Sequence, residues 1–225
     1  MIIFKHALKR SLAQPISILI TLILPIGIIF VPPLANSYPN GIYLYGLLSL
    51  FSAFILSKPI VEERLNKITV RISATPTKYI SYLSSHLMAY TSILVVQNII
   101  FILGIYLYWK DLNINYWYIF SLNFVYILMS IAFSLCWNSL FKSYNLSFGL
   151  FSGFASIMCL VSGVTMPLQV IPEEIKKFIV VLPTYWLPYG LNSLHDGNIK
   201  YVLIAHLVLL IYSGIFLLIG SKRRY

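Results

Sequence analysis

Charged residues are scarce in this sequence. They make up 10% of its 225 residues, against about 25% in soluble domains, while 59% of the residues are hydrophobic. Such a chain cannot cover a folded surface with polar side chains, which excludes an ordinary soluble domain. At about 20 residues for each membrane span, the length suits one bundle of about six spans and leaves no room for a soluble catalytic domain.

Reactive residues are equally scarce. The two cysteines, Cys136 and Cys159, lie in apolar runs, which is typical of small core residues and gives no disulfide framework. The sequence contains no Ser-His-Asp or Cys-His arrangement, no metal-spaced cluster and no G-x-x-x-x-G-K-[ST] phosphate loop. We therefore expect no catalytic residues, no bound metal or cofactor, and no ATP hydrolysis by this chain itself.

Long apolar runs separated by short polar stretches predict an all-α membrane protein with a six-helix transmembrane bundle. The expected spans cover residues 16–34, 41–61, 79–108, 117–141, 148–166 and 200–220. Ahead of them, Phe4, Leu8 and Leu12 recur at a spacing of four with basic residues between them. This pattern favours an N-terminal helix over residues 1–14 that lies in the cytoplasmic interface.

The basic residues favour one side of the membrane. With both termini in the cytoplasm, 12 of the 16 Lys and Arg and two of the six acidic residues lie inside, and four of each lie outside. The net charge of +10 is then cytoplasmic, as the positive-inside rule expects, and no nucleic-acid partner is needed to explain it. The many Ile, Asn, Lys and Tyr residues favour a bacterial source, so we expect a multi-pass protein of the bacterial plasma membrane.

Charge is absent from the middle of every expected span, which counts against a proton- or sodium-driven carrier. Gln97, Asn98 and His206 are the polar exceptions, and they suit either hydrogen bonds between helices or the lining of a pathway. Gly149 and Gly153 form a G-x-x-x-G pair that lets helices approach closely. That approach could be within the bundle or across a dimer.

The stretch from Val61 to Tyr79 is the only long polar stretch in an otherwise apolar chain. Apolar residues spaced by four, three and four predict an amphipathic cytoplasmic helix over residues 62–76, which Pro76 ends. A second unusual stretch runs from Ser162 to Tyr189. Its prolines and apolar spacing predict a short helix that dips into the outer leaflet, within an extracellular re-entrant segment over residues 168–195.

Together these two stretches resemble motifs of the transmembrane subunits of type-2 ATP-binding-cassette (ABC) permeases. Glu63-Arg64 and Ala74-Thr75-Pro76 match the cytoplasmic motif E-R-E-x-G-T-x-x-x-L-x-A-T-P, although Lys67 and Ile68 replace its Gly-Thr pair. The outer motif S-G-x-x-x-P-x-x-x-x-P, followed by L-x-P-x-x-Y, is matched by Ser162, Gly163, Pro167, Pro172, Pro183 and Trp186. Tyr185 stands one place early, and Asn192 lies near the place where an arginine often follows.

The resemblance implies a transporter with separate ATPase subunits. Two permease subunits, alike or different, would pair within the membrane lipid and dock two copies of an ABC ATPase, which would bind ATP and Mg. The helix over residues 62–76 would be the coupling helix. The residues implied in ATPase coupling are Glu63, Arg64, Lys67, Arg71, Thr75 and Pro76.

An uncharged, aromatic-rich bundle favours export of an amphipathic or hydrophobic cargo, such as an antimicrobial peptide, a drug or a lipid-like molecule. Export of a polysaccharide is an alternative, since the resembled family includes it, and a passive channel is another. An intramembrane protease is a further alternative, because Glu62-Glu63 resembles the start of an E-E-x-x-x-R motif whose carboxylates activate a metal-bound water. The arginine of that motif is missing.

Overall fold

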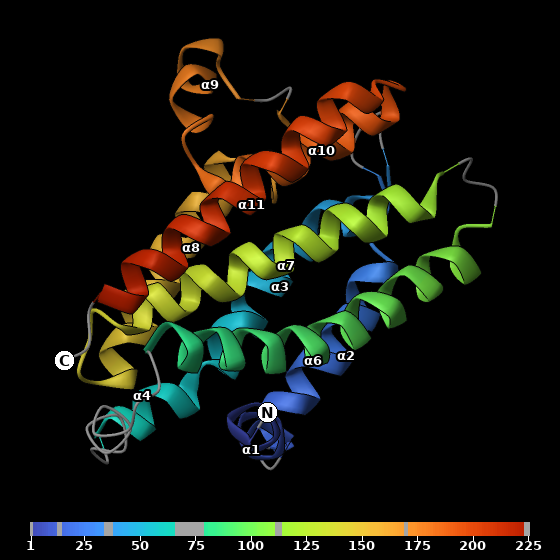
Figure 1. Ribbon diagram of the computed structural model, residues 1–225. Coiled ribbons are helices and arrows are strands. Elements are labelled where there is room, and N and C mark those ends of the chain that lie inside the picture. Colours follow the sequence, from blue (N-terminus) through green and yellow to red (C-terminus); the bar gives the residue numbers. More distant parts are fainter. Residues whose placement is uncertain are drawn as a thin grey trace.

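The computed structural model describes residues 2–12, 15–33, 38–65, 79–110, 114–168 and 171–222, and every element within them is helical. In chain order the elements are α1 (Ile2–Leu12), α2 (Pro15–Ile29), α3 (Asn40–Leu56), α4 (Lys58–Leu65), α6 (Tyr79–Tyr108), α7 (Tyr116–Asn138), α8 (Tyr144–Val161), α9 (Glu173–Ile179), η2 (Pro183–Tyr185), α10 (Trp186–His195) and α11 (Ile199–Lys222). Figure 1 shows long helices side by side, with α1, α4 and both chain ends at one end of the bundle and α9 at the other.

Five of the described helices are long and apolar enough to cross a membrane. They are Asn40–Glu63, which combines α3 with most of α4, and Ser81–Tyr108, Tyr116–Asn138, Tyr144–Val161 and Ile199–Lys222; these stretches overlap the second to sixth expected spans. The first expected span, residues 16–34, overlaps α2, a helix of 15 residues with Pro25 inside it. This is shorter than the roughly 20 residues that a straight span needs. The all-helical architecture is confirmed, whereas the six-span topology stays a prediction.

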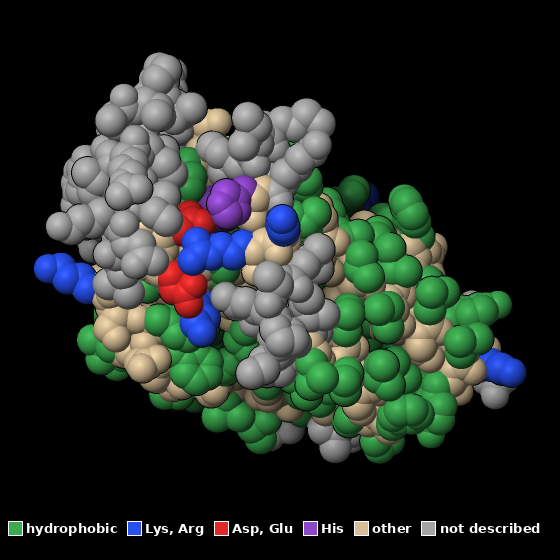
Figure 2. Space-filling model, turned by 90° about the horizontal axis from the view of Figure 1, so that it is seen from below, with side chains coloured by type: hydrophobic (Ala, Val, Ile, Leu, Met, Phe, Trp, Pro, Cys, Tyr) green, Lys and Arg blue, Asp and Glu red, His purple; other side chains and the backbone are tan. Residues whose placement is uncertain are grey.

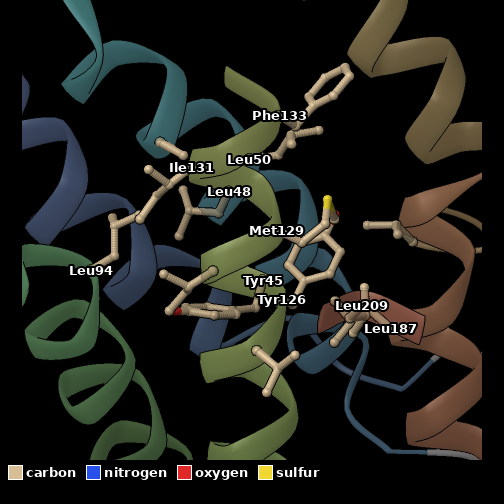
Figure 3. Packing of buried hydrophobic residues seen from close by; sticks show 14 of the residues in the cluster. Tyr45, Leu48, Leu50, Leu94, Tyr126, Met129, Ile131, Phe133, Leu187 and Leu209 are labelled. Carbon is tan, nitrogen blue, oxygen red and sulfur yellow. The ribbon is translucent and has the colours of Figure 1, made fainter. Parts of the chain in front are cut away.

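The core of the bundle is built around α7. Leu122, Tyr126, Ile127 and Ile131 have no exposed surface, and their spacing makes them point in different directions from the helix. A helix that is apolar on all sides is expected in the middle of a bundle. Figure 3 shows residues of α7 between side chains of α3 and α6 on one side and Leu187 and Leu209, from α10 and α11, on the other. In contrast, α8 and α11 leave most of their apolar surface exposed.

Two contacts fix the end of α2. The Trp109 indole Nε1 donates a hydrogen bond to the Ile29 carbonyl oxygen at 2.9 Å, which satisfies one of the orphan carbonyls of that helix end. Gly41, in the first turn of α3, lies against the carbonyl group of Ile28, so closely that a Cβ atom there would overlap the oxygen. The backbones of α2 and α3 can therefore approach this closely only because residue 41 has no side chain.

We expect Gly41→Ala to lower the free energy of unfolding by about 1–3 kcal/mol, because the overlapping atom is backbone and cannot rotate away. Gly214→Ala is the matched control, since a Cβ atom at Gly214 in α11 meets nothing within 4 Å. Thermal unfolding of both variants in detergent micelles gives the comparison. Equal transition temperatures would contradict the close packing of α2 on α3.

Candidate functional site

A cluster of charged side chains connects α1 to α4 at the end of the bundle that carries the chain termini. Arg10 Nη1 donates a hydrogen bond to Glu63 Oε1 at 3.0 Å, and Arg10 Nη2 donates one to Glu62 Oε2 at 3.1 Å. Lys58 Nζ lies 3.7 Å from Glu62 Oε1, one helical turn away. Figure 2 shows basic and acidic side chains gathered on this end. One guanidinium thus joins both carboxylates of α4.

Glu63 is the buried member of this cluster, with 7% of its surface exposed. Besides Arg10, its carboxylate accepts a hydrogen bond from the Tyr82 hydroxyl of α6 and lies 3.6 Å from His86 Nε2. His86 Nδ1 in turn lies 3.0 Å from the Tyr90 hydroxyl. Because a buried carboxylate is stable only when it is paired and hydrogen-bonded, these contacts hold α1, α4 and α6 together.

The apolar face of α1 also packs on the bundle. Ala7 is 2% exposed, and Phe4 and Leu8 pack against the hydrophobic core. The apolar stripe that predicts an interfacial helix therefore contacts the protein core at Phe4 and Leu8. Its basic neighbour Lys9 is exposed.

The structure places part of the predicted coupling helix in α4. This helix begins at Lys58, four residues before the expected start at residue 62. Glu63 belongs to the charge cluster, and Arg64 lies in the last two residues of α4. The other predicted coupling residues lie outside the described residues: Lys67, Arg71, Thr75 and Pro76. Their contact with an ATPase stays a prediction.

Sequence reasoning missed the partners of Glu63. Arg10 lies 53 positions away in the chain, and Tyr82 and His86 lie in the next long helix. The available signal was the position of Glu62 and Glu63. They are the only acidic residues on the predicted inner side, and they follow an apolar span directly. A carboxylate so close to the hydrophobic core requires a cation or hydrogen-bond donors nearby.

At the opposite end, Gly163 reverses the chain after α8. Its φ angle of 88° lies in the left-handed region, and a Cβ atom there would overlap the Leu168 side chain. The amide nitrogens of Val164 and Thr165 donate to the Cys159 carbonyl oxygen at 3.2 and 3.3 Å, and Ser162 Oγ donates to the same oxygen at 3.4 Å. The positive φ angle therefore explains why a glycine stands at this end of α8.

The segment that follows folds back onto α8 and α11. Thr184 Oγ1 donates to the Met158 carbonyl oxygen at 3.5 Å, and the Tyr212 hydroxyl donates to the Val181 carbonyl oxygen at 2.7 Å. Trp186 Nε1 donates to the Val180 carbonyl oxygen at 3.1 Å. The residues of the predicted outer motif differ in their exposure. Ser162, Gly163 and Pro183 are buried, Pro167 and Trp186 are half-buried, and Pro172 is exposed.

The helix α9 has seven residues and directly follows Pro172. Ile179 is buried, but Ile175 is 43% exposed, Phe178 is 80% exposed, and Val181, just beyond the helix, is 72% exposed. Such exposure is compatible with the predicted contact with the outer leaflet, which stays a prediction.

In contrast, α10 inserts between the long helices. Leu187 and Leu191 have no exposed surface, and a Cβ atom at Gly46 of α3 would lie 2.5 Å from Leu187 Cδ2. The Tyr43 hydroxyl donates a hydrogen bond to Asn192 Oδ1 at 2.6 Å, which ties α3 to α10. Asn192 therefore forms a neutral interhelical contact near the place where an arginine often follows the resembled motif.

The outer end of α10 carries a small group of titratable residues. The His195 ring meets the Tyr38 ring edge to face at 5.2 Å, and His195 Nδ1 lies 3.6 Å from Asp196 Oδ1. Burial and the nearby Asp196 carboxylate raise the pKa of Tyr38 above its ordinary value of 10.0. Among the described residues, no three His, Cys, Asp or Glu side chains gather in a way that could hold a metal.

Gly149 and Gly153 lie on an outward face of α8. A Cβ atom at either position meets nothing within 4 Å, and both residues are exposed. Large apolar neighbours, among them Leu150 and Ile157, are 50% and 64% exposed. Of the two alternatives for this glycine pair, the described chain therefore gives no support to close packing within the bundle.

Comparison with protein families gives one match. A family model described as "ABC-2 family transporter protein" matches residues 31–222. It covers far more than half of the chain and includes all the described helices except α1 and α2. No curated protein matches this sequence.

We expect Arg10→Ala to destabilise the protein by about 2 kcal/mol, because it leaves the buried Glu63 carboxylate without its cation. Lys9→Ala removes a neighbouring charge from α1 that is exposed, and we expect it to have little effect. Thermal unfolding of the purified protein compares the two. An equal loss in both variants would mean that net charge, rather than the contact with Glu62 and Glu63, stabilises this end.

Proposed function

Because this chain belongs to the ABC-2 family of transporter proteins, which are membrane permease subunits that work with an ABC ATPase, we propose that it is the permease of an ATP-driven exporter of amphipathic or hydrophobic cargo. The observation that carries the proposal is the family match over residues 31–222. In this assignment ATP and Mg bind to two copies of a separate ATPase, and this chain carries out no chemistry.

The charged end of the bundle supports the proposed site of ATPase coupling. Here α4 leads directly into the segment that matches the family's cytoplasmic motif, and its carboxylates are held by Arg10 from α1. A force applied to α4 is therefore resisted by a buried ion pair that also reaches α6 through Tyr82. In this proposal Glu63 positions the coupling helix from within, and the ATPase contacts the residues that follow it.

The polar groups inside the bundle support a cargo that is not an ion. The described spans contain no buried Lys, Arg or Asp, and Glu63, their buried acid, is paired. Gln97 Nε2 donates to Ser52 Oγ at 3.3 Å, and Asn123 Nδ2 donates to Asn98 Oδ1 at 3.2 Å. These side chains form hydrogen bonds between helices, which favours the structural role over the lining of an ion pathway.

The same charge cluster argues against the protease alternative. A metal-dependent hydrolase needs carboxylates that are free to hold or activate a metal-bound water. Glu62 and Glu63 instead accept hydrogen bonds from one arginine, within 3.1 Å. Their geometry is that of an ion pair between helices.

The open face of α8 supports pairing with a second permease subunit. Small residues allow close approach of helix backbones in lipid, where apolar packing alone gives little driving force. Gly149 and Gly153 lie on this face with no neighbour within 4 Å of their would-be Cβ atoms. We place the dimer contact there, with either an identical or a related chain.

The proposed ATPase coupling is tested first in the adjacent reading frame, where we expect a phosphate-loop ATPase, and then with that ATPase and this chain expressed together. We expect the two proteins to co-purify, and the complex in proteoliposomes to move a fluorescent lipid analogue or an amphipathic cationic peptide when ATP is added. Arg64→Ala with Arg71→Ala should lower this transport about tenfold, through loss of contacts to the ATPase worth about 1.4 kcal/mol.

The matched control removes two charges from the other end, with Lys110→Ala and Lys200→Ala. We expect it to leave ATP-driven transport unchanged. A chain that binds no ATPase, or that passes the probes equally well without ATP, would refute the exporter and favour a channel.

The proposed dimer contact is tested by filling the glycine face. Gly149→Leu with Gly153→Leu should raise the dimer dissociation constant about tenfold, because bulky side chains keep the helices apart. Gly214→Leu is the control, since Gly214 of α11 is also open. Native mass spectrometry of protein in lipid nanodiscs gives the dimer fraction. A dimer that tolerates both changes must use another surface.

A further inference from the structure

A buried turn separates α3 from α4 at Ser57. Its side chain has no exposed surface, and Ser57 Oγ donates a hydrogen bond to the Phe54 carbonyl oxygen at 2.6 Å. This bond satisfies a carbonyl at the end of α3, and α4 begins at the next residue. Ser57 is thus the joint between a membrane-spanning helix and the proposed coupling helix.

Asn138, the last residue of α7, bridges this joint to α8. Its Nδ2 donates to Ser57 Oγ at 2.6 Å, and its Oδ1 accepts from Ser147 Oγ at 2.7 Å. All three side chains are fully buried. A carboxamide is suited to this place because it presents a donor and an acceptor at once. In surroundings of low polarity each broken bond leaves an unpaired buried group, which makes the bridge stiff.

Aromatic contacts connect the same two regions. Phe54, one turn before the joint, stacks on Phe151 of α8 with ring centroids 4.0 Å apart, and on Tyr144 at 5.7 Å. Lys58, the first residue of α4, lies over the Tyr144 ring at 5.6 Å. The first turns of α8 are therefore held mainly by the α3–α4 joint, while the opposite face of α8 carries the open glycines.

We propose that Asn138 is a positioning residue that transmits displacement of α4 to α8. This inference rests on the proposed function, in which the ATPase moves α4. A shift of α4 moves Ser57 at its base, the Asn138 carboxamide follows because both of its groups are hydrogen-bonded, and Ser147 carries the shift into α8. The face of α8 that pairs with the second permease then moves with the ATPase cycle.

The variants Asn138→Ala and Ser147→Ala remove the bridge at its centre and at its α8 side. Ser134→Ala is the matched control, because this serine of α7 is also fully buried but its hydroxyl bonds to the Ser130 carbonyl oxygen of its own helix at 2.8 Å. Ser147→Ala is the milder change and serves alone if Asn138→Ala does not fold.

The first measurement is amide hydrogen exchange over residues 144–150 of the full chain in lipid nanodiscs. We expect exchange in both bridge variants to be about fivefold faster than in the wild type, as suits the loss of one buried hydrogen bond, and the control to be unchanged. The second measurement is the amount of lipid analogue transported per ATP hydrolysed by the complex with the ATPase. We expect this ratio to fall about fivefold in the bridge variants alone.

The ratio separates transmission from stability, since protein that is merely unstable loses transport and ATP hydrolysis together. Bridge variants that match Ser134→Ala in exchange or in transport per ATP overturn the inference and leave the exporter intact. A wild-type complex that shows no ATP-driven transport overturns the proposed function, and the inference falls with it.

Discussion

The arrangement of the charged end depends on one constraint, which is that Glu63 is buried. A carboxylate that is only 7% exposed requires a cation and hydrogen-bond donors, and Arg10, Tyr82 and His86 surround it. Their need to meet at one point brings the N-terminal helix, α4 and α6 together. In a chain with six acidic residues, this group therefore fixes where α1 lies together with the apolar face of α1, which packs on the bundle.

The two ends of the bundle are stabilised by different means. The end with the termini uses an ion pair, whereas the outer segment is held by neutral donors on carbonyl oxygens, such as Thr184 on Met158 and Tyr212 on Val181. Close backbone approach replaces charge there, with Gly163 at the turn after α8 and Gly46 under Leu187. Neutral contacts need no desolvation of charge when they form, which suits a segment that inserts among apolar helices.

Much of this fold could be predicted from local pattern, and much of the site could not. Long apolar runs predict helices, because each helix depends on residues that are close together in the chain. The partners of Glu63 depend on how helices pack, so the contact with Arg10, 53 positions away, had no local signal. The contact of Asn192 also had no local signal, because its partner Tyr43 lies in a distant part of the chain. The spacing of Gly149 and Gly153 predicted that the two glycines share one face of a helix. It did not predict whether that face points into the bundle or away from it.

The fold provides a mechanical connection between the two ends, and it runs through α3 as well as α8. At the end of the bundle that carries the chain termini, α3 stops at Ser57, where Asn138 holds it, and at the opposite end its Tyr43 is bonded to Asn192 of α10. A helix is stiff along its axis, so displacement of one end is carried to the other when both are anchored by buried bonds. The segment after α8 also contacts α8 directly, because Thr184 donates a hydrogen bond to the Met158 carbonyl oxygen near the end of that helix. In the proposed transport cycle, motion that begins at α4 would therefore reach the segment after α8 by two routes, and both begin at the same hydrogen-bonded joint.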